Sequence, residues 1–336
     1  MDQETVMPRA GIIQLLTFIG LLYSGIVSSA ESLLDPLPSW HDGTNKQSII
    51  QFVNDVTNKA SKDYVIPENR IATFDNDGTL WLEQPEYTQV IFMLSRLKEL
   101  AKTHPEWQLQ EPVKSVMKNN ISHLTDEDIE QIFTLTSSDI SPEEYIFTIQ
   151  KWLASHTNPH FKRPYTQLIY QPMLELIHYL QKNAFTVYIV SGGGQDFVRA
   201  FSPSTYHIPV DNVIGSSSQT DYQYINGKPT LMKTPKPLLI SNFAGKPKAI
   251  YLFVGKKPIL AIGNSDGDRQ MLEWTQSGEG KRLLMLIHHD DAKREYAYDT
   301  QSKVGTFSAA LFQEANKKHW SIVSMKNDWK TIFPNK

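Results

Sequence analysis

The stretch that decides the fold is IATFDNDGT, residues 71–79. Its first four residues are apolar or β-branched and predict a short buried strand, and the polar remainder predicts a loop at the strand's carboxyl end. Asp75 and Asp77 stand two positions apart, so both can point into one site. One could act as a nucleophile and the other as an acid, or both could hold a hard cation such as Mg²⁺. An ordinary turn is the competing interpretation, because Asn, Asp and Gly are common in turns.

Three further apolar runs predict strands at residues 185–190, 258–262 and 282–287, with helical patterns between them. This alternation predicts an α/β fold, a doubly wound parallel sheet covered by helices on both faces. In such sheets ligands bind outside the carboxyl ends of the strands. Each run is followed by a polar or glycine-rich loop, so the loops are expected to meet at one edge of the sheet.

Residues 86–165 look helical throughout, and Thr125 and Ser141 are expected helix N-caps. We therefore predict an inserted α-helical cap at residues 86–165. The α/β core is expected to comprise residues 31–85 and 166–336, with a C-terminal extension that packs on it.

The first thirty residues differ from the rest. An apolar run from Gly11 to Val27 follows Arg9 and precedes Ser28-Ser29-Ala30, a pattern typical of a secretory signal peptide. Residues 1–30 are therefore expected to be a signal peptide, with a retained membrane anchor as the alternative. Either way we expect the protein to be periplasmic or secreted, and without its signal to have no membrane partner.

Composition excludes several classes of protein. The chain has 336 residues, of which 40% are hydrophobic and 11% aromatic, and its net charge is −3. A core can form, so disorder is excluded, and a basic surface for nucleic acid is not expected. The chain has no cysteine, which excludes disulfides, thiol nucleophiles and cysteine-bound metals.

Two later segments add to the first loop. Ser191 and Gly192 open a glycine-rich turn before a helix, where a hydroxyl and backbone N–H groups can hold phosphate oxygens. Lys246 precedes the strand that leads to the loop GNSDGD, residues 263–268. In this order, DNDGT, Ser191, Lys246 and GNSDGD resemble the four motifs of the haloacid dehalogenase-like hydrolase superfamily, most closely its phosphoserine phosphatase-like branch. The likeness covers residues 70–275, and the helical block lies where that branch has its cap.

The resemblance implies a role for each matching residue. Asp75 would form an aspartyl-phosphate, and Asp77 would protonate the leaving group and later activate water. Thr79, Ser191 and Gly192 would hold the phosphate. Lys246 would neutralise charge, with Lys248 as a competitor for that role.

The implied cofactor is Mg²⁺, held by Asp75, the Asp77 carbonyl and the last loop. Asn264 occupies the usual aspartate position there, and Asp268 matches the second acidic position and is also a candidate metal residue. Asp266 and Asp268 are the alternatives if Asn264 is not the ligand. An amide oxygen brings no charge, so we expect weaker Mg²⁺ binding than in an aspartate-bearing relative, and stronger binding in Asn264→Asp. Trp81, Glu83 and Glu86 match the family too poorly to receive a role.

The function expected from these residues is Mg²⁺-dependent hydrolysis of a small phosphate ester. A non-catalytic phospho-ligand-binding protein and a phosphotransferase are the alternatives. The loop at residues 288–291, His-His-Asp-Asp, is expected to be hydrogen-bonded or solvated rather than a second metal site.

Overall fold

The structure is a computed structural model that describes Met1, residues 35–298 and residues 300–335. The predicted signal peptide, Met1 excepted, lies outside these described residues. Leu37–Lys336 form one compact unit. Within the described ranges, no helix has both the length and the apolar character needed to cross a membrane.

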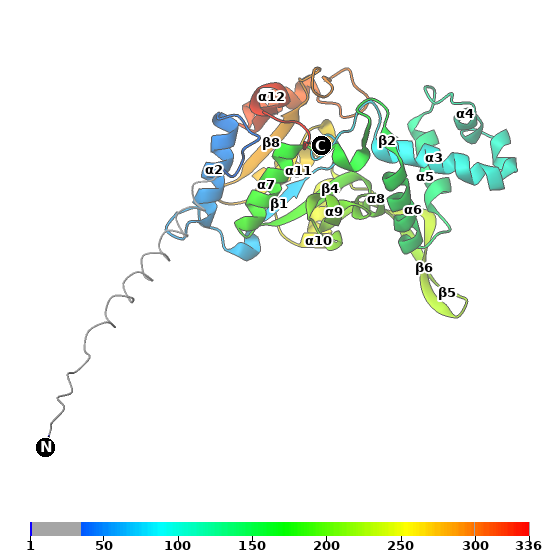
Figure 1. The fold of residues 1–336 in the computed structure, drawn as a ribbon, viewed down its shortest axis with the longest axis horizontal. Coiled ribbons are helices and arrows are strands. Elements are labelled where there is room, and N and C mark those ends of the chain that lie inside the picture. Colours follow the sequence, from blue (N-terminus) through cyan, green and yellow to red (C-terminus); the bar gives the residue numbers. More distant parts are fainter. Residues whose placement is uncertain (2–34, 299, 336) are drawn as a thin grey trace. The chain divides into compact units, whose positions relative to one another are not determined.

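A seven-stranded sheet organises the unit, in the order β6-β5-β4-β1-β7-β8-β9 (Figure 1). All neighbouring pairs are parallel except β5 and β6. The strands are β1 Ile71–Phe74, β4 Thr186–Gly194, β5 Val213–Ile225, β6 Lys228–Leu239, β7 Leu260–Gly263, β8 Leu283–His288 and β9 Ser321–Ser324. The predicted doubly wound α/β fold is confirmed.

Helices cover both faces of the sheet because the strand residues alternate. Leu260 and Ile262 of β7 join the core cluster of α2 and α7, whereas Ala261 joins that of α10, α11 and α12. The helices of the core are α2 Thr44–Thr57, α7 Gln171–Lys182, α8 Gln195–Arg199, α9 Ser202–Tyr206, α10 Gly245–Val254, α11 Arg269–Gln276, α12 Ala309–Lys317 and α13 Met325–Asp328.

The block predicted as a helical cap contains α3 Thr88–Thr103, α4 Val113–Met117, α5 Asp126–Ser137 and α6 Pro142–Ser155 (Figure 1). Thr125 accepts from the Asp128 backbone N–H, and Ser141 accepts from that of Glu144, so both predicted N-caps are present. The block is not helical throughout, because it ends in a two-stranded ribbon of β2 Thr157–Asn158 and β3 Arg163–Pro164.

The β5–β6 hairpin was not predicted from the sequence. Strand β5 begins beside β4 and continues beyond the sheet, where β6 returns antiparallel to it (Figure 1). The turn is Asn226-Gly227, both at positive φ, which is a strong hairpin signal. The hairpin attaches to the helical block through two backbone hydrogen bonds, from Asp139 N to Lys233 O and from Lys233 N to Ile140 O. The block is therefore supported by a second part of the chain.

The C-terminal extension contributes more than packing. Its strand β9 pairs with β8 and forms one edge of the sheet. Trp329 of the same extension packs edge-on against Trp40, with ring centroids 5.9 Å apart. The extension is thus part of the core.

Candidate active site

The predicted site residues meet at the carboxyl edge of the sheet. Asp75 follows β1, Ser191 lies in the last part of β4, and Asn264 follows β7. Strands β4 and β7 are the two neighbours of β1, which places the loops side by side. Lys246 comes from the first turn of α10. Four segments that are distant in sequence therefore supply one site.

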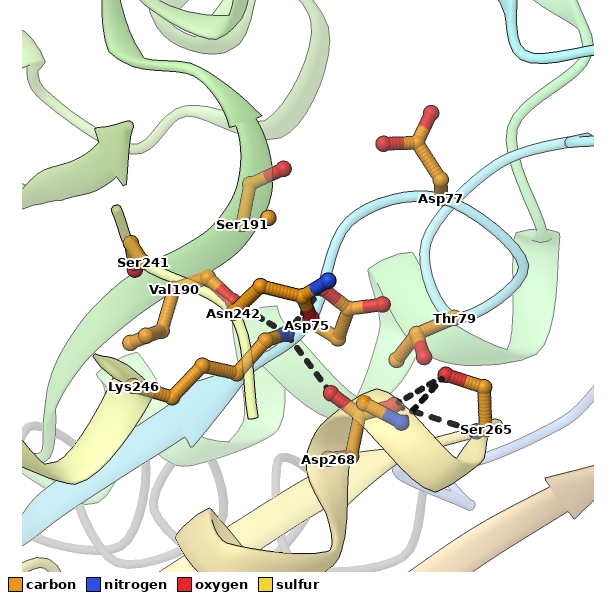
Figure 2. A network of polar contacts seen from close by, with 12 residues as sticks. Asp75, Asp77, Thr79, Val190, Ser191, Ser241, Asn242, Lys246, Ser265 and Asp268 are labelled. Carbon is orange, nitrogen blue, oxygen red and sulfur yellow. Dashed lines mark hydrogen bonds and ion pairs between the residues drawn. The ribbon is translucent and has the colours of Figure 1, made fainter. Parts of the chain in front are cut away.

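Lys246 lies at the centre of this site and is 2% exposed. Its ammonium donates to Asp75 Oδ1, to Asp268 Oδ1 over 2.6 Å and to the Val190 carbonyl over 2.7 Å (Figure 2). Lys248 is exposed. Of the two lysines that the sequence offered, the structure brings Lys246 to the carboxylates.

The last loop fixes Asp268. Its Oδ2 accepts from the backbone N–H of Asn264 over 3.0 Å and from that of Ser265 over 3.1 Å. Its other oxygen is thereby directed at Lys246. Asp268 is fully buried, so this arrangement has little freedom.

Negative charge accumulates around Asp75. Burial is the largest cause that raises the pKa of Asp75, to about 8, and the Asp268 and Asp77 carboxylates add to it. The Lys246 ammonium acts in the opposite direction. One ammonium does not fully offset burial and two neighbouring carboxylates, so a further cation would favour the ionised form of Asp75.

Asp77 points away from Lys246, toward the side of the site where Ser191 lies (Figure 2). Its Oδ1 accepts from the Trp81 indole N–H over 2.8 Å. Burial raises the pKa of Asp77, and the Trp81 hydrogen bond opposes this. An acid that holds its proton more strongly than usual, beside an ion-paired carboxylate, suits donation to a leaving group.

The glycine turn faces Asp77. A side chain at Gly193 would place its Cβ 3.3 Å from Ser191 Oγ and 3.8 Å from Asp77 Oδ2. Ser191 Oγ accepts from the Gly193 N–H over 3.0 Å. The pairing of β4 with β5 is irregular between Val190 and Gly194. The structure thus brings Ser191 and the turn that contains Gly192 to the acid of the first loop.

Thr79 takes a different place from the other predicted phosphate ligands. It is fully buried, and its hydroxyl donates to Asn264 Oδ1 over 3.1 Å. A phosphate oxygen would have to compete with that bond. Thr79 is therefore a hydrogen-bond partner of the predicted metal ligand Asn264.

Several residues at the site had no role in the sequence analysis. Glu83 accepts from Asn264 Nδ2 over 2.7 Å and from the Tyr298 hydroxyl over 2.6 Å. Gln89, in the first turn of α3, accepts from the Gly194 N–H over 2.8 Å, so the helical block contacts the glycine turn directly. Glu83 follows a loop already identified, but Tyr298 lies 34 positions beyond Asn264, and no local pattern marks it.

The loop after β8 is hydrogen-bonded, as expected. His289 Nε2 lies 2.7 Å from the Gly78 carbonyl, and its Nδ1 lies 3.2 Å from Glu295. Asp291 instead pairs with Arg294. Neighbouring side chains of this loop thus turn to different partners, and His289 supports the backbone of the first motif.

The donor set suits a hard cation. The Asp75 carboxylate, the Asp77 carbonyl and the Asn264 amide supply oxygens, which Mg²⁺ prefers. Among the described residues, no three Asp, Glu or His side chains are arranged to hold a metal by themselves, so backbone and amide oxygens would be needed. The excess of carboxyl groups over ammonium groups also favours a cation. The residues present therefore fit the implied Mg²⁺.

Comparison with known proteins gives the family. The model of the haloacid dehalogenase-like hydrolases matches residues 72–273, more than half of the chain. The chain belongs to this family. The resemblance seen in the sequence is thus confirmed, and the match includes all four motifs of this hydrolase. No curated protein matches the chain.

Several solved structures are similar to the hydrolase. A protein of unknown function from Anaerococcus prevotii DSM 20548 has a TM-score of 0.50 at 16% identity, over 85% of this chain and 94% of that one. One of unknown function from Bordetella pertussis Tohama I has a TM-score of 0.46 at 14% identity, over 76% and 98%. A phosphoserine phosphohydrolase-like protein from Francisella tularensis has a TM-score of 0.35 at 15% identity, over 65% and 87%.

Proposed function

We propose that this hydrolase is a Mg²⁺-dependent phosphomonoesterase that acts through an aspartyl-phosphate on Asp75. Its substrate is a small phosphorylated molecule, and its place of action is the periplasm or the cell exterior. The family membership supports hydrolysis, and the arrangement of the two aspartates supports the phosphoryl chemistry.

In the first half-reaction, a carboxylate oxygen of Asp75 attacks the phosphorus, and the bond from phosphorus to the ester oxygen breaks. Asp77 gives its proton to the departing alkoxide, which leaves as an alcohol. Burial raises the pKa of Asp77, which favours the protonated form that this step uses. Lys246 holds Asp75 in place and offsets charge on the phosphoryl group.

In the second half-reaction, the Asp77 carboxylate takes a proton from water, and the water oxygen attacks the phosphorus of the aspartyl-phosphate. The bond from phosphorus to the Asp75 oxygen breaks and releases inorganic phosphate. Asp77 is protonated again, and both carboxyl groups return to their starting states.

Mg²⁺ bound by Asp75, the Asp77 carbonyl and Asn264 would supply positive charge to the phosphoryl oxygens. Ser191 and the N–H groups of Gly192 and its neighbours would orient those oxygens. Positioning and charge compensation are the main requirements of phosphoryl transfer.

The observation that carries this proposal is the ion pair of Lys246 with Asp75, buried beside a second carboxylate on the same loop. A protein that only binds a phosphorylated ligand needs hydrogen-bond donors to the phosphate oxygens, but it does not need a buried nucleophile paired with a separate acid. The pair therefore favours catalysis over simple binding.

A screen of phosphate monoesters with the purified protein, with and without Mg²⁺, tests the proposal. Asp75→Asn is expected to abolish phosphate release, since its amide cannot form the acyl phosphate. Release that persists in this variant would overturn the mechanism. Tight binding of a phosphate ester without turnover would instead identify a binding protein, and a phosphorylated product in added alcohol would identify a phosphotransferase.

A further inference from the structure

We propose that Glu83 is a positioning residue that orients the Asn264 amide toward the cation and supplies the negative charge that Asn264 lacks. In this view Asn264 and Glu83 together replace the single aspartate usual at this position. The inference rests on the proposed Mg²⁺-dependent function and adds a residue to it.

The first observation is the orientation of the Asn264 amide. Its Nδ2 donates to Glu83 Oε1 over 2.7 Å, and its Oδ1 accepts from Thr79 over 3.1 Å. A carboxylate can only accept from the amide, so Glu83 selects the rotamer that turns the amide nitrogen toward itself. The amide oxygen then lies on the side of the first loop, where the other predicted Mg²⁺ ligands are.

The second observation is burial. Glu83 and Asn264 are each 1% exposed. A buried carboxylate is costly unless it is hydrogen-bonded and its charge is offset. Within the described residues, the hydrogen bonds to Glu83 come from Asn264 and Tyr298, which are both uncharged. These bonds satisfy one carboxylate oxygen but leave the charge to be balanced by something else, and a cation held by Asn264 would balance it.

The third observation is that the backbone leaves space for this carboxyl group. Gly78 and Gly305 both have positive φ, 70° and 64°. A Cβ at either position would collide with the Glu83 carboxyl group, and at Gly78 also with the Asn264 amide. Two segments far apart in sequence are thus shaped around the pair, and one of them is the first motif itself.

The alternative is that Glu83 only stabilises the fold. Glu295 is a suitable contrast, because it is also buried but contacts Tyr170 and His289 rather than a predicted metal ligand. Glu83 differs from Glu295 because it is hydrogen-bonded to Asn264, a predicted ligand of the cation. Removing a residue that is hydrogen-bonded to a metal ligand typically lowers the metal affinity by about 10–100-fold.

The test is Mg²⁺ binding to the full chain, measured by isothermal titration calorimetry without substrate. Glu83→Gln is expected to weaken binding by about 10–100-fold. Glu86→Gln is the matched control, because Glu86 lies three residues away and accepts from its own neighbour Tyr87. It removes the same charge without touching Asn264, and its affinity should equal that of the wild type.

A reversed pair separates charge and orientation from folding. In Glu83→Gln with Asn264→Asp, the new amide can donate to the new carboxylate, so hydrogen bond and charge are both restored. Its Mg²⁺ affinity is expected to return toward that of the wild type and to recover most of the roughly 10–100-fold loss expected for the single variant. The reversed pair remains a valid test even if Glu83→Gln alone folds poorly. Thermal melts without Mg²⁺ would reveal such a folding defect.

The outcomes are distinct. If the wild type binds no Mg²⁺, the proposed metal dependence is overturned, and this inference with it. If the wild type and Glu83→Gln bind Mg²⁺ equally, only the role of Glu83 is overturned. A reversed pair that folds but binds as weakly as Glu83→Gln would also overturn that role.

Discussion

The ammonium of Lys246 lies 2.6 Å from Asp268 Oδ1, while the other oxygen of Asp268 is held by backbone N–H groups of the last loop. The position of Lys246 is therefore set by Asp268. Because Lys246 also contacts Asp75, the last motif controls the charge environment of the first.

Asp268→Asn should lower kcat by about 10²-fold with a smaller change in KM, because Lys246 loses the charge that positions it. Steady-state kinetics on any ester that is hydrolysed would measure this. Asp266→Asn is the control, since Asp266 lies in the same loop but accepts from Ser308. Equal losses in both variants would contradict a specific role for Asp268.

Asp77→Asn should lower kcat by about 10²–10⁴-fold for an alkyl phosphate, because the alkoxide then departs without a proton. The loss should be much smaller for p-nitrophenyl phosphate in the first half-reaction, since nitrophenolate needs no proton to leave. Burst kinetics of nitrophenolate release would separate the two steps. The same loss in that first step for both esters would argue against Asp77 as the acid.

The site carboxyl groups predict a pH dependence of stability in the absence of divalent cations. Burial raises the pKa of Asp75 to about 8 from its ordinary value of 3.8, and it also raises the pKa of Asp77 and Glu83. Between these two pH values the folded state binds more protons than the unfolded state. The free energy of unfolding should therefore fall as the pH rises from about 4 to about 8.

Urea unfolding in EDTA at several pH values would measure this slope. Asp75→Asn should make it shallower, because one of the contributing groups no longer titrates. Added Mg²⁺ should raise stability most at the upper end of the range, where the carboxyl groups are ionised. A stability that instead rises with pH between 5 and 8 in EDTA would mean that other groups dominate.

A partly buried ion pair connects the hairpin to α8, and its contribution to stability can be measured. Lys233 of β6 is 5% exposed, lies 2.5 Å from Asp196 of α8 and sits 5.2 Å from the ring centroid of Tyr145 in α6. Lys233→Met should cost about 3 kcal/mol of unfolding free energy, because Asp196 then keeps an unpaired, partly buried charge.

Denaturant melts of Lys233→Met, Asp196→Asn and the double variant form the necessary cycle. The double variant should be more stable than Lys233→Met alone, since no charge is left unpaired. Lys228→Met, at an exposed position beside the hairpin turn, should change stability little. Additive losses in the cycle would show that the two residues are not coupled.

Much of the site could be predicted because its residues follow strands. Buried parallel strands form short apolar runs, and their carboxyl ends share one edge, so Asp75, Ser191 and Asn264 could be expected together. Lys246 was harder to identify because it begins a helix, and its burial against Asp75 and Asp268 is what distinguishes it from Lys248 in the structure.

Glu83 and Tyr298 could not be given roles from the sequence, because tertiary structure alone brings Glu83 to Asn264 and Tyr298 to Glu83. The hairpin is a different case. Asn226-Gly227 is a local signal that was present in the sequence. The polar strands around it lack the apolar pattern by which the other strands were recognised, so the turn signal stood alone.

The hairpin changes how the helical block can move. The block joins the core through its two chain connections and through contacts such as that of Gln89 with Gly194, and backbone hydrogen bonds of Lys233 attach it to β6, whose partner β5 starts beside β4 in the central sheet. A block held only at two adjacent chain connections can rotate about them. An additional attachment, such as the hairpin, opposes this rotation. Rotation of the block relative to the core would then require the hairpin to bend, so the stiffness of the hairpin opposes that rotation.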